Sequence, residues 1–473
     1  MIKPASWLIT AFLVLLTACS ARSASTSAPP GSSTATTNGG LTGARGYLFP
    51  SAPAIPVGAL TPATSTAVDQ LLASAESGLD FEALGVVAAS GDARLGWVIA
   101  DLMRFLQVGQ AGEELIGAFE KLTGVELAAD PTSAESPWRA VTDHLIAWDL
   151  PAPPGYQEMK RRLFLLVEPG WSPFFSDKDA AIDWRWLSWG GVLIDDRPLG
   201  DRGGCQRGCI PALDDPALTD AADGGWYSDD DVVFGIVVNR QAVAFPKNMM
   251  EIHEMVNISI GGRRLGIPYC TLCGSAQAYF LDSVPLWDKP IVLRTSGLLS
   301  RSNKVMYDLT SQSVIDTFSG VALSGPLQDA TVTLEQTTVV ASLWGDWKTE
   351  HPNTMIVARD GGIGRNYPDD PLQGRDAAGP VFPVGDVDPR LEAQTLVVGV
   401  IGQDGVPLAF PTDQARSAIA EGKQVSIGDV RLLADGSGLR AELADGSEVV
   451  AHQAFWFAWS QFHPGTLVWT SGA

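Results

Sequence analysis

The chain reads Trp344-Gly-Asp-Trp347-Lys-Thr-Glu-His351-Pro352-Asn-Thr354 and later returns to the same phrase as Trp456-Phe-Ala-Trp459-Ser-Gln-Phe-His463-Pro464-Gly-Thr466. The two phrases agree at both Trp positions and at the His, Pro and Thr positions. Upstream of each phrase, a short apolar run ends in Ala-Phe-Pro, at residues 244–246 and again at 409–411. An internal repeat of this kind predicts a duplicated structural unit.

The residues that precede the first phrase alternate between short strand patterns and a short helix pattern. Apolar runs at 232–238 and 242–245 are separated by Asn239-Arg240-Gln241, which predicts a β-hairpin. Residues 246–257 have helical spacing, and their Pro stands at a position that a helix start tolerates. We therefore predict a duplicated β-rich domain with short helices: a first copy over 201–358, a connector over 359–395 and a degenerate second copy over 396–473.

The N-terminal half of the chain has a different pattern. Between residues 61 and 200 apolar residues recur at the three- and four-residue spacing of helices, for example at Val68, Leu71 and Leu72. The pairing of short amphipathic helices resembles a stacked helical-repeat module, and a plain helical bundle is the alternative. The predicted fold class is thus α+β, with an N-terminal helical module ahead of the duplicated β-rich domain.

The first residues indicate export. Lys3 is followed by an apolar run and then by Leu16-Thr-Ala-Cys19, which resembles the lipobox of bacterial lipoproteins. We expect residues 1–19 to be a signal peptide, Cys19 to carry the lipid, and the Ser/Thr/Gly/Pro-rich residues 20–60 to form a tether. An ordinary cleaved signal peptide or a short anchor is the alternative. The protein is therefore expected outside the cytoplasm, bound to a bacterial membrane by its lipid.

Composition excludes one class of partner. The 473 residues include 32 Lys and Arg but 54 Asp and Glu, so the formal net charge is −22. Nucleic-acid binding requires a basic surface that neutralises phosphates. We therefore expect no nucleic-acid partner.

The motif with the richest chemistry is Cys270-Thr-Leu-Cys273-Gly. A turn of this type directs two sulfurs to one point, which suits a soft metal ion or a redox disulfide. On the helix predicted before it, Met249, His253 and Asn257 would share one face. Cys270, Cys273 and His253 are therefore the expected ligands of a zinc or copper ion.

Three further residues belong to this hypothesis. Glu254 and Asn257 would orient the ligands, and Met249 would favour copper by adding a thioether. A closed zinc site needs four ligands, and Cys205 and Cys209, in a Gly-rich stretch, are candidates for the missing ones.

Two other functions remain open for the same cysteines. Exported proteins often hold an even set of cysteines as structural disulfides, and four cysteines allow three pairings. The chain would then be a non-catalytic surface scaffold. Alternatively the protein is a thiol-disulfide oxidoreductase, with Cys270 as the nucleophile and Cys273 as the resolving thiol.

Two smaller predictions concern polar residues. Ser296, Ser300, Asn303 and Lys304 lie between strand patterns and suit a loop that binds a polar or anionic ligand, with a solvated turn as the alternative. The repeated His of each phrase, His351 and His463, stands before a Pro, and we expect it to cap the last carbonyls of a helix, with catalysis as the alternative.

Several motifs of the C-terminal half occur together and in order. They are Ala244-Phe-Pro, His253-Glu-Met-Val-Asn257, Tyr269-Cys-Thr-Leu-Cys-Gly-Ser-Ala276, Ser296-Gly-Leu-Leu-Ser-Arg-Ser-Asn303, Val305-Met-Tyr-Asp308, and the stretch from Trp344 to Thr354. From about Cys205 to the C-terminus the chain resembles the prokaryotic domain-of-unknown-function family number 3179, DUF3179. The resemblance implies an exported or surface protein with a Cys-x-x-Cys-Gly motif, and it implies no established activity.

Overall fold

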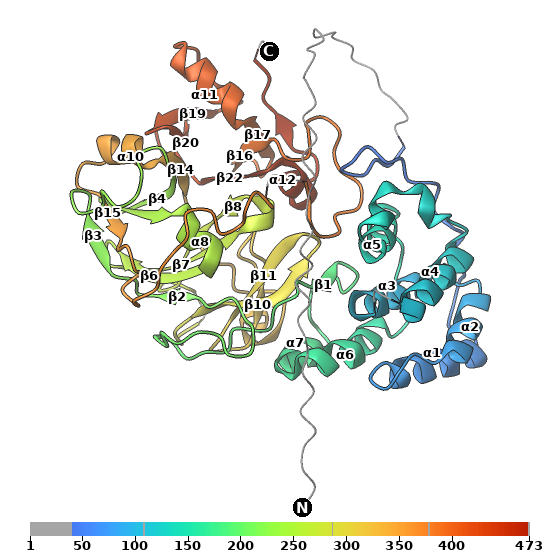
Figure 1. Ribbon diagram of the computed structural model, residues 1–473. Coiled ribbons are helices and arrows are strands. Elements are labelled where there is room, and N and C mark those ends of the chain that lie inside the picture. The colour runs from blue at the N-terminus through green and yellow to red at the C-terminus, as the bar shows by residue number, and fades with distance from the viewer. Residues whose placement is uncertain (1–39, 107–108, 286, 377–378, 472–473) are drawn as a thin grey trace, which may run out of the picture. The chain divides into compact units, whose positions relative to one another are not determined.

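The computed structural model describes residues 40–106, 109–285, 287–376 and 379–471, and in them a helical region precedes a β-rich region (Figure 1). This order confirms the predicted α+β class. The predicted signal peptide, with Cys19, and the first part of the tether lie outside the described residues. No helix among those described is long and apolar enough to cross a membrane.

The helical region consists of seven α-helices and short 3₁₀ turns. Its α-helices are α1 (Pro62–Ser74), α2 (Phe81–Ala89), α3 (Gly96–Phe105), α4 (Gly109–Thr123), α5 (Pro137–Ala147), α6 (Tyr156–Val167) and α7 (Ser172–Ser176), and its 3₁₀ turns are η1 (Ala93–Leu95), η2 (Leu127–Ala129), η3 (Pro131–Ala134) and η4 (Pro169–Trp171). The side chains of Thr61, Asp80 and Ser136 accept backbone N–H groups at the starts of α1, α2 and α5, as N-cap residues do. Trp97, together with apolar residues from the other helices, fills the core between α3, α5 and α6.

The β-rich region contains five small sheets in a propeller-like ring (Figure 1). The first sheet has the order β1 (Leu187–Trp189), β10 (Leu293–Ser300), β11 (Asn303–Asp308), β12 (Val314–Ile315). The second has the order β13 (Gln336–Thr337), β9 (Ala278–Phe280), β7 (Arg263–Cys270), β6 (Met255–Ile260), β2 (Leu213–Asp214), and β8 (Ser275–Ala276) pairs with β7. The third has the order β14 (Val340–Leu343), β4 (Val232–Val238), β5 (Gln241–Pro246), β15 (Met355–Val357), β3 (Leu218–Asp220).

The other two sheets belong to the C-terminal part of the chain. The fourth has the order β22 (Ala451–Phe455), β16 (Leu396–Ile401), β17 (Pro407–Pro411), β23 (Leu467–Val468), and the fifth has the order β18 (Ser426–Ile427), β19 (Val430–Asp435), β20 (Gly438–Leu443), β21 (Glu448–Val449). Five helices and one 3₁₀ turn connect these strands: α8 (Lys247–His253), η5 (Thr271–Cys273), α9 (Gly325–Asp329), α10 (Trp344–Glu350), α11 (Thr412–Ala420) and α12 (Trp456–Phe462).

The third and fourth sheets share one strand order around the repeated phrases. In the third sheet β4 pairs antiparallel with β14 and β5, and β5 pairs parallel with β15. In the fourth sheet β16 pairs antiparallel with β22 and β17, and β17 pairs parallel with β23. The predicted hairpin between β4 and β5 is confirmed, with Asn239 and Arg240 both at positive φ in its two-residue turn.

Each repeated phrase begins a short helix whose second Trp covers a strand glycine. A Cβ added to Gly235 would lie 2.4 Å from the Trp347 ring, and one added to Gly399 would lie 2.1 Å from the Trp459 ring. Only glycine leaves room for an indole this close to the sheet. The repeated Gly and Trp therefore fit each other in both sheets.

The repeated His caps its helix as predicted, through its backbone. The backbone N–H of His351 donates to the Trp347 carbonyl, and that of His463 to the Trp459 carbonyl, at 2.8 and 2.9 Å. The imidazoles lie against the indoles, with ring centroids 4.0 and 4.2 Å apart. The backbone of each His therefore completes the helix end, and its side chain packs on the Trp of the same phrase.

The helix predicted over 246–257 is shorter in the structure. It ends at His253, because Glu254 adopts a left-handed conformation with φ 50°, and β6 begins at the next residue. Antiparallel pairing of β6 with β7 overrides the helical spacing there. The expectation that Asn257 shares a helix face with Met249 and His253 was therefore wrong.

The helical and β-rich regions share a core. The Trp171 indole donates to the Ser296 carbonyl at 2.7 Å, and the Asp143 carboxylate accepts the N–H groups of Val384 and Gly385. The hydroxyl of Tyr47, in the later part of the predicted tether, lies 3.3 Å from His144 Nε2. Residues 40–473 form one compact unit, and the predicted domain boundaries stay predictions.

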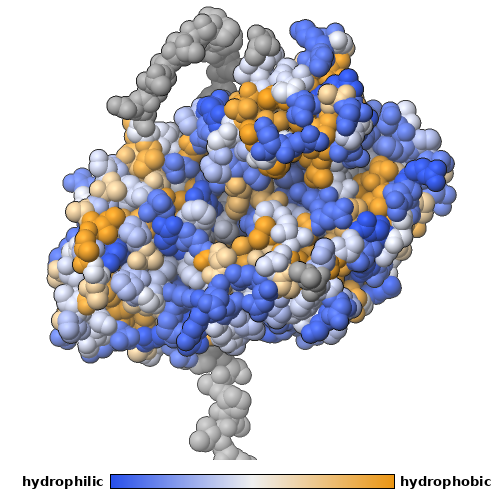
Figure 2. All heavy atoms as spheres, turned by 180° about the vertical axis from the view of Figure 1, so that it is seen from behind, coloured by the Kyte–Doolittle hydropathy of each residue, from blue (hydrophilic) through white to orange (hydrophobic). Residues whose placement is uncertain are grey.

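The face seen in Figure 2 is largely hydrophilic, with separate hydrophobic areas.

Candidate functional site

The Cys-x-x-Cys motif lies where β7 ends and the chain turns back. Cys270 is the last residue of β7 and the N-cap of η5, and Cys273 is the last residue of η5. Gly274 has φ 58°, which lets β8 fold back and pair with β7. This turn brings both sulfurs to the same place inside the protein. Cys270 is 2 % exposed and Cys273 0 %, and both are free thiols.

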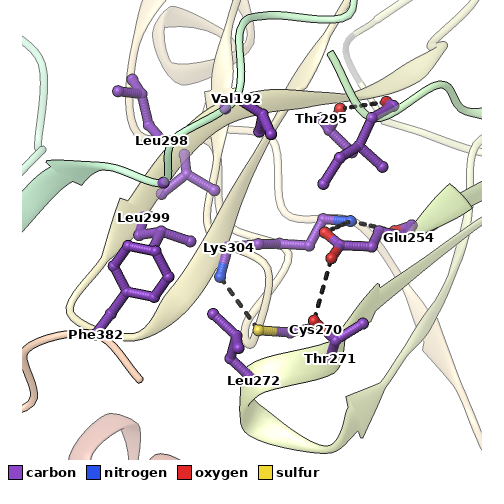
Figure 3. Close-up of a pocket in the computed structure, with 14 residues that line it drawn as sticks. Val192, Glu254, Cys270, Thr271, Leu272, Thr295, Leu298, Leu299, Lys304 and Phe382 are labelled. Carbon is purple, nitrogen blue, oxygen red and sulfur yellow. Dashed lines mark hydrogen bonds and ion pairs between the residues drawn. The ribbon is translucent and has the colours of Figure 1, made fainter. Parts of the chain in front are cut away.

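The β10–β11 hairpin supplies the groups that contact the two sulfurs. The Ser302 carbonyl oxygen accepts from both thiols, with Sγ to O distances of 3.8 Å for Cys270 and 3.5 Å for Cys273. The backbone N–H of Lys304 donates to Cys270 Sγ at 3.4 Å, as Figure 3 shows. Only Cys270 receives this backbone donor, so the surroundings of the two thiols differ.

The pKa values of the two thiols move in opposite directions. For Cys270, burial favours the neutral thiol, but hydrogen bonds from Cys273 and from the Lys304 N–H, together with the Lys304 charge, leave the pKa below its ordinary value. For Cys273, burial and the neighbouring Cys270 both raise the pKa well above its ordinary value. Cys270 is therefore the thiol that ionises first.

A buried carboxylate and a buried ammonium lie beside the thiols. Lys304 Nζ is 3.6 Å from Glu254 Oε2, and it also donates to the backbone carbonyls of Glu254 and Tyr269. The Thr271 hydroxyl donates to Glu254 Oε1 at 3.2 Å. Burial raises the pKa of Glu254 and lowers that of Lys304, and the charge of each partner opposes both shifts.

These groups line a small cavity of about 80 Å³. Cys270, Thr271, Glu254 and Lys304 form its polar side. The apolar part of its lining, labelled in Figure 3, consists of Val192, Leu272, Leu298, Leu299 and Phe382. The cavity is smaller than most small-molecule sites, but like them it combines apolar walls with a few convergent polar groups.

The part of the chain that contains this site matches a known family. Residues 207–438 match the model of a family described as "Protein of unknown function (DUF3179)". This region belongs to the DUF3179 family. The match confirms the resemblance, although it ends before the second Trp phrase. No curated protein and no solved structure matches the chain.

The DUF3179 region does not bring His253 to the two cysteines. Its Nδ1 lies 2.7 Å from the Pro211 carbonyl oxygen and its Nε2 2.8 Å from the Tyr367 hydroxyl. Burial lowers the pKa of His253 to about 4. In the described residues the one group of His, Cys, Asp or Glu close enough to share a metal ion is Asp195 with Cys205 and Cys209. Those two cysteines form a disulfide, so their sulfurs are already bonded to each other.

The predicted supporting residues are dispersed in the DUF3179 region. Met249 is buried in the core between the second and third sheets. The Asn257 amide donates to Asp214 Oδ1 and to the Leu293 carbonyl, both at 3.0 Å, and so joins β6 to neighbouring segments. Glu254 is the exception, because it lines the cysteine cavity.

The predicted ligand loop is a hairpin. Ser296 and Ser300 lie on β10, and Asn303 and Lys304 lie on β11. The Ser296 hydroxyl donates to the Val305 carbonyl at 2.5 Å, and Asn303 Oδ1 is buried without a partner among the described residues. Lys304 alone among the four lines the cysteine cavity. The sequence offered one signal for it, a lysine inside an apolar strand pattern.

Proposed function

We propose that Cys270 and Cys273 form a redox-active dithiol that exchanges with disulfides outside the cytoplasm. The observation that carries the proposal is the pair of free thiols in one turn, in which Cys270 Sγ accepts the backbone N–H of Lys304, and the two pKa shifts agree with it. Exchange needs an attacking thiolate and a second thiol that stays protonated until it resolves the intermediate. The cavity beside Cys270 offers space for the substrate sulfur.

The exchange proceeds in two steps. The Cys270 thiolate attacks one sulfur of a substrate disulfide, a bond forms between the two sulfurs, and the other substrate sulfur leaves as a thiolate that takes up a proton. Cys273 then loses its proton and attacks Cys270 Sγ, which releases the first substrate sulfur as a thiolate. Two electrons pass from the dithiol to the substrate, so the protein gains a disulfide and the substrate becomes two thiols.

Glu254 is the residue that would accept the Cys273 proton. Its charge raises the pKa of both thiols, which requires it to lie close to them. Its own pKa is raised by burial, which makes its carboxylate a stronger base than an exposed one. Lys304 and Thr271 hold this carboxylate in position.

The first test traps the mixed disulfide. Purified Cys273→Ser protein is incubated with oxidised glutathione, with Cys270→Ser as the matched control, and both are analysed by mass spectrometry. We expect a glutathione adduct on Cys270 in the first variant and none on Cys273 in the second. Equal adduct formation in both, or none in either, would contradict the assignment of Cys270 as nucleophile.

The same preparation tests metal binding, which stays a prediction. Zinc or copper on Cys270 and Cys273 would use the two adjacent sulfurs, but His253 Nδ1 and Nε2 both contact other groups. Metal analysis of protein purified without chelator decides between the two functions. About one ion per chain, lost in Cys270→Ser, would favour the metal site over the redox couple.

We also infer that the protein is a lipoprotein held outside the cytoplasm through Cys19. The Cys205–Cys209 disulfide supports export, because disulfides persist in oxidising compartments. Cell fractionation tests the anchor: Cys19→Ala should move the protein from the membrane to the soluble fraction. An unchanged membrane fraction would contradict lipidation at this residue.

The third and fourth sheets are, we infer, copies of one duplicated unit. Their shared strand order and the repeated Gly, Trp and Thr support this. Alignment of the two segments across the DUF3179 family tests the idea. Family members whose two segments lack a common register would contradict it.

A further inference from the structure

A second cavity lies at the C-terminal end of α8, where His253 forms part of its wall. It has a volume of about 310 Å³ and is separate from the cysteine cavity. Two loops form its rim, one with Arg202, Gly203 and Gly204 and the other with Gly364 and Arg365. Nothing in the proposed redox chemistry uses this cavity.

Two arginines near the cavity have charges that are already matched: Arg197 lines it, and Arg294 bonds to the lining residue Asp214. The Arg197 guanidinium donates to the Asp195 carboxylate and to three backbone carbonyls. Arg294 donates to both carboxylate oxygens of Asp214, at 3.0 and 2.7 Å. These two ion pairs leave no excess charge, and they fix the cavity wall in place.

The rim holds two arginines whose charges are not matched in this way. Arg202 donates to the Gly362 carbonyl at 2.9 Å, and the Arg365 guanidinium lies 5.8 Å from the centre of the Tyr367 ring. Among the described residues, neither forms an ion pair with a carboxylate. Asp201 is the remaining acid in the wall, and its carboxylate accepts the Gly203 N–H at 2.7 Å.

The balance of these charges is positive. Arg202 and Arg365 carry two charges against the one of Asp201, in a chain whose net charge is −22. The charges of Arg365 and Arg197 also add to the effect of burial in lowering the pKa of His253. His253 is therefore neutral at pH 7, and the positive field in the cavity comes from the arginines.

We propose that this cavity binds a small molecule through an oxyanion group, a phosphate or a carboxylate, held between Arg202 and Arg365. Guanidinium groups match the geometry of both oxyanions and bind them with two parallel hydrogen bonds. The glycines of the rim, Gly203, Gly204 and Gly364, let a ligand approach the backbone closely. The volume lies within the range of small-molecule sites.

The test measures anion binding by titration calorimetry on the full chain, with inorganic phosphate and malonate as separate probes and sodium chloride as the blank. The variants are Arg202→Gln, Arg365→Gln and the double substitution. Arg416→Gln on α11 is the matched control, because it removes the same charge from an exposed helix position outside the cavity. Each variant is first checked for native circular dichroism.

We expect each cavity variant to bind the preferred probe about tenfold more weakly, and the double variant to lose measurable binding, because each loses a charge-assisted hydrogen bond. Arg416→Gln should bind like the wild type. Tighter binding of phosphate identifies a phosphorylated ligand, and tighter binding of malonate a carboxylate. Equal affinity in wild type and double variant, or no binding of either probe by the wild type, would overturn the proposal.

Discussion

The third and fourth sheets, which carry the Trp phrases, share what we call the Trp frame: four strands in one order and a short helix that begins at the first Trp of the phrase. The segments that lie between these shared elements differ. In both sheets, an indole N–H donates to the Thr hydroxyl of the same phrase, Trp347 to Thr354 at 3.0 Å and Trp459 to Thr466 at 3.1 Å. In the third sheet, the chain between α8 and β14 forms most of the second sheet, with its Cys-x-x-Cys turn, and the β10–β11 hairpin. In the fourth sheet, the chain between α11 and β22 forms only the hairpins of the fifth sheet.

The repeated His shows how the differing segments change the surroundings of a shared residue. His351 Nε2 lies 2.7 Å from Asp435 Oδ1, at a cavity of about 200 Å³ that Arg440 also lines. His463 packs instead against Phe318, and burial lowers its pKa to about 4. Asp435 comes from β19, a strand of the fifth sheet. The comparison teaches that the frame is repeated, whereas the chemistry depends on what packs onto it.

The largest effect should come from removing the indole of either frame. Trp347→Ala and Trp459→Ala each create a large cavity in a core where the rings are 0 % and 1 % exposed. We expect each to lower the free energy of unfolding by about 3–5 kcal/mol. Urea unfolding followed by circular dichroism measures this. A loss below about 1 kcal/mol in one copy would break the equivalence of the frames.

A smaller effect should follow when the indole loses its acceptor. Thr354→Val and Thr466→Val keep the side-chain shape but leave a buried indole N–H without its partner. We expect each to cost about 1–3 kcal/mol. Thr349→Val on α10 is the control, because that hydroxyl is exposed and bonds only to its own helix. Unequal losses at Thr354 and Thr466 would show that the frames differ in strength.

The His463 environment should appear in the pH dependence of stability. Its folded pKa of about 4 lies below the ordinary 6.5, so the unfolded chain binds a proton first as pH falls. Stability from this group is therefore complete above about pH 6.5 and is lost as pH falls toward 4. His463→Gln should lose less stability than the wild type between pH 7 and pH 5, as measured by thermal unfolding. An equal loss in both proteins would contradict the burial of a neutral imidazole.

The smallest effect should come from the His351 pair. Asp435→Asn removes the carboxylate that contacts His351 Nε2 at a partly open cavity, and such half-exposed contacts contribute about 0.2–1 kcal/mol. We expect a loss in this range, and a similar one for His351→Asn. A double-mutant cycle in urea separates the pair from other contacts. A coupling energy well above this range would show that the contact stabilises the protein more than a half-exposed pair is expected to.

Local patterns explain which parts of the fold could be predicted. The hairpin at Asn239-Arg240 and the helices of the N-terminal region follow from spacing and turn residues over a few positions. The end of α8 did not follow, because pairing of β6 with β7 is a contact between distant residues. The strand ends the helix at His253, where spacing alone would extend it to Asn257.

The candidate site could be predicted only in part for the same reason. Cys270 and Cys273 are close in sequence, so their motif predicts that the two thiols lie close together. Ser302 and Lys304 reach the sulfurs through the β10–β11 hairpin, far along the chain. Without that contact the sequence favoured His253 as the third member of the site, and the structure surrounds the sulfurs with other groups.

The sequence by itself determined the repeated Trp frame, the order of helical and β-rich regions, the DUF3179 membership and the nearness of Cys270 to Cys273. Each of these follows from residues that are close together in the sequence or recur in the same order. Tertiary structure decided which cysteines bond, which groups contact the thiols and which arginines share a cavity. Those outcomes depend on packing between distant segments, where burial and partner charges, rather than spacing, set the chemistry.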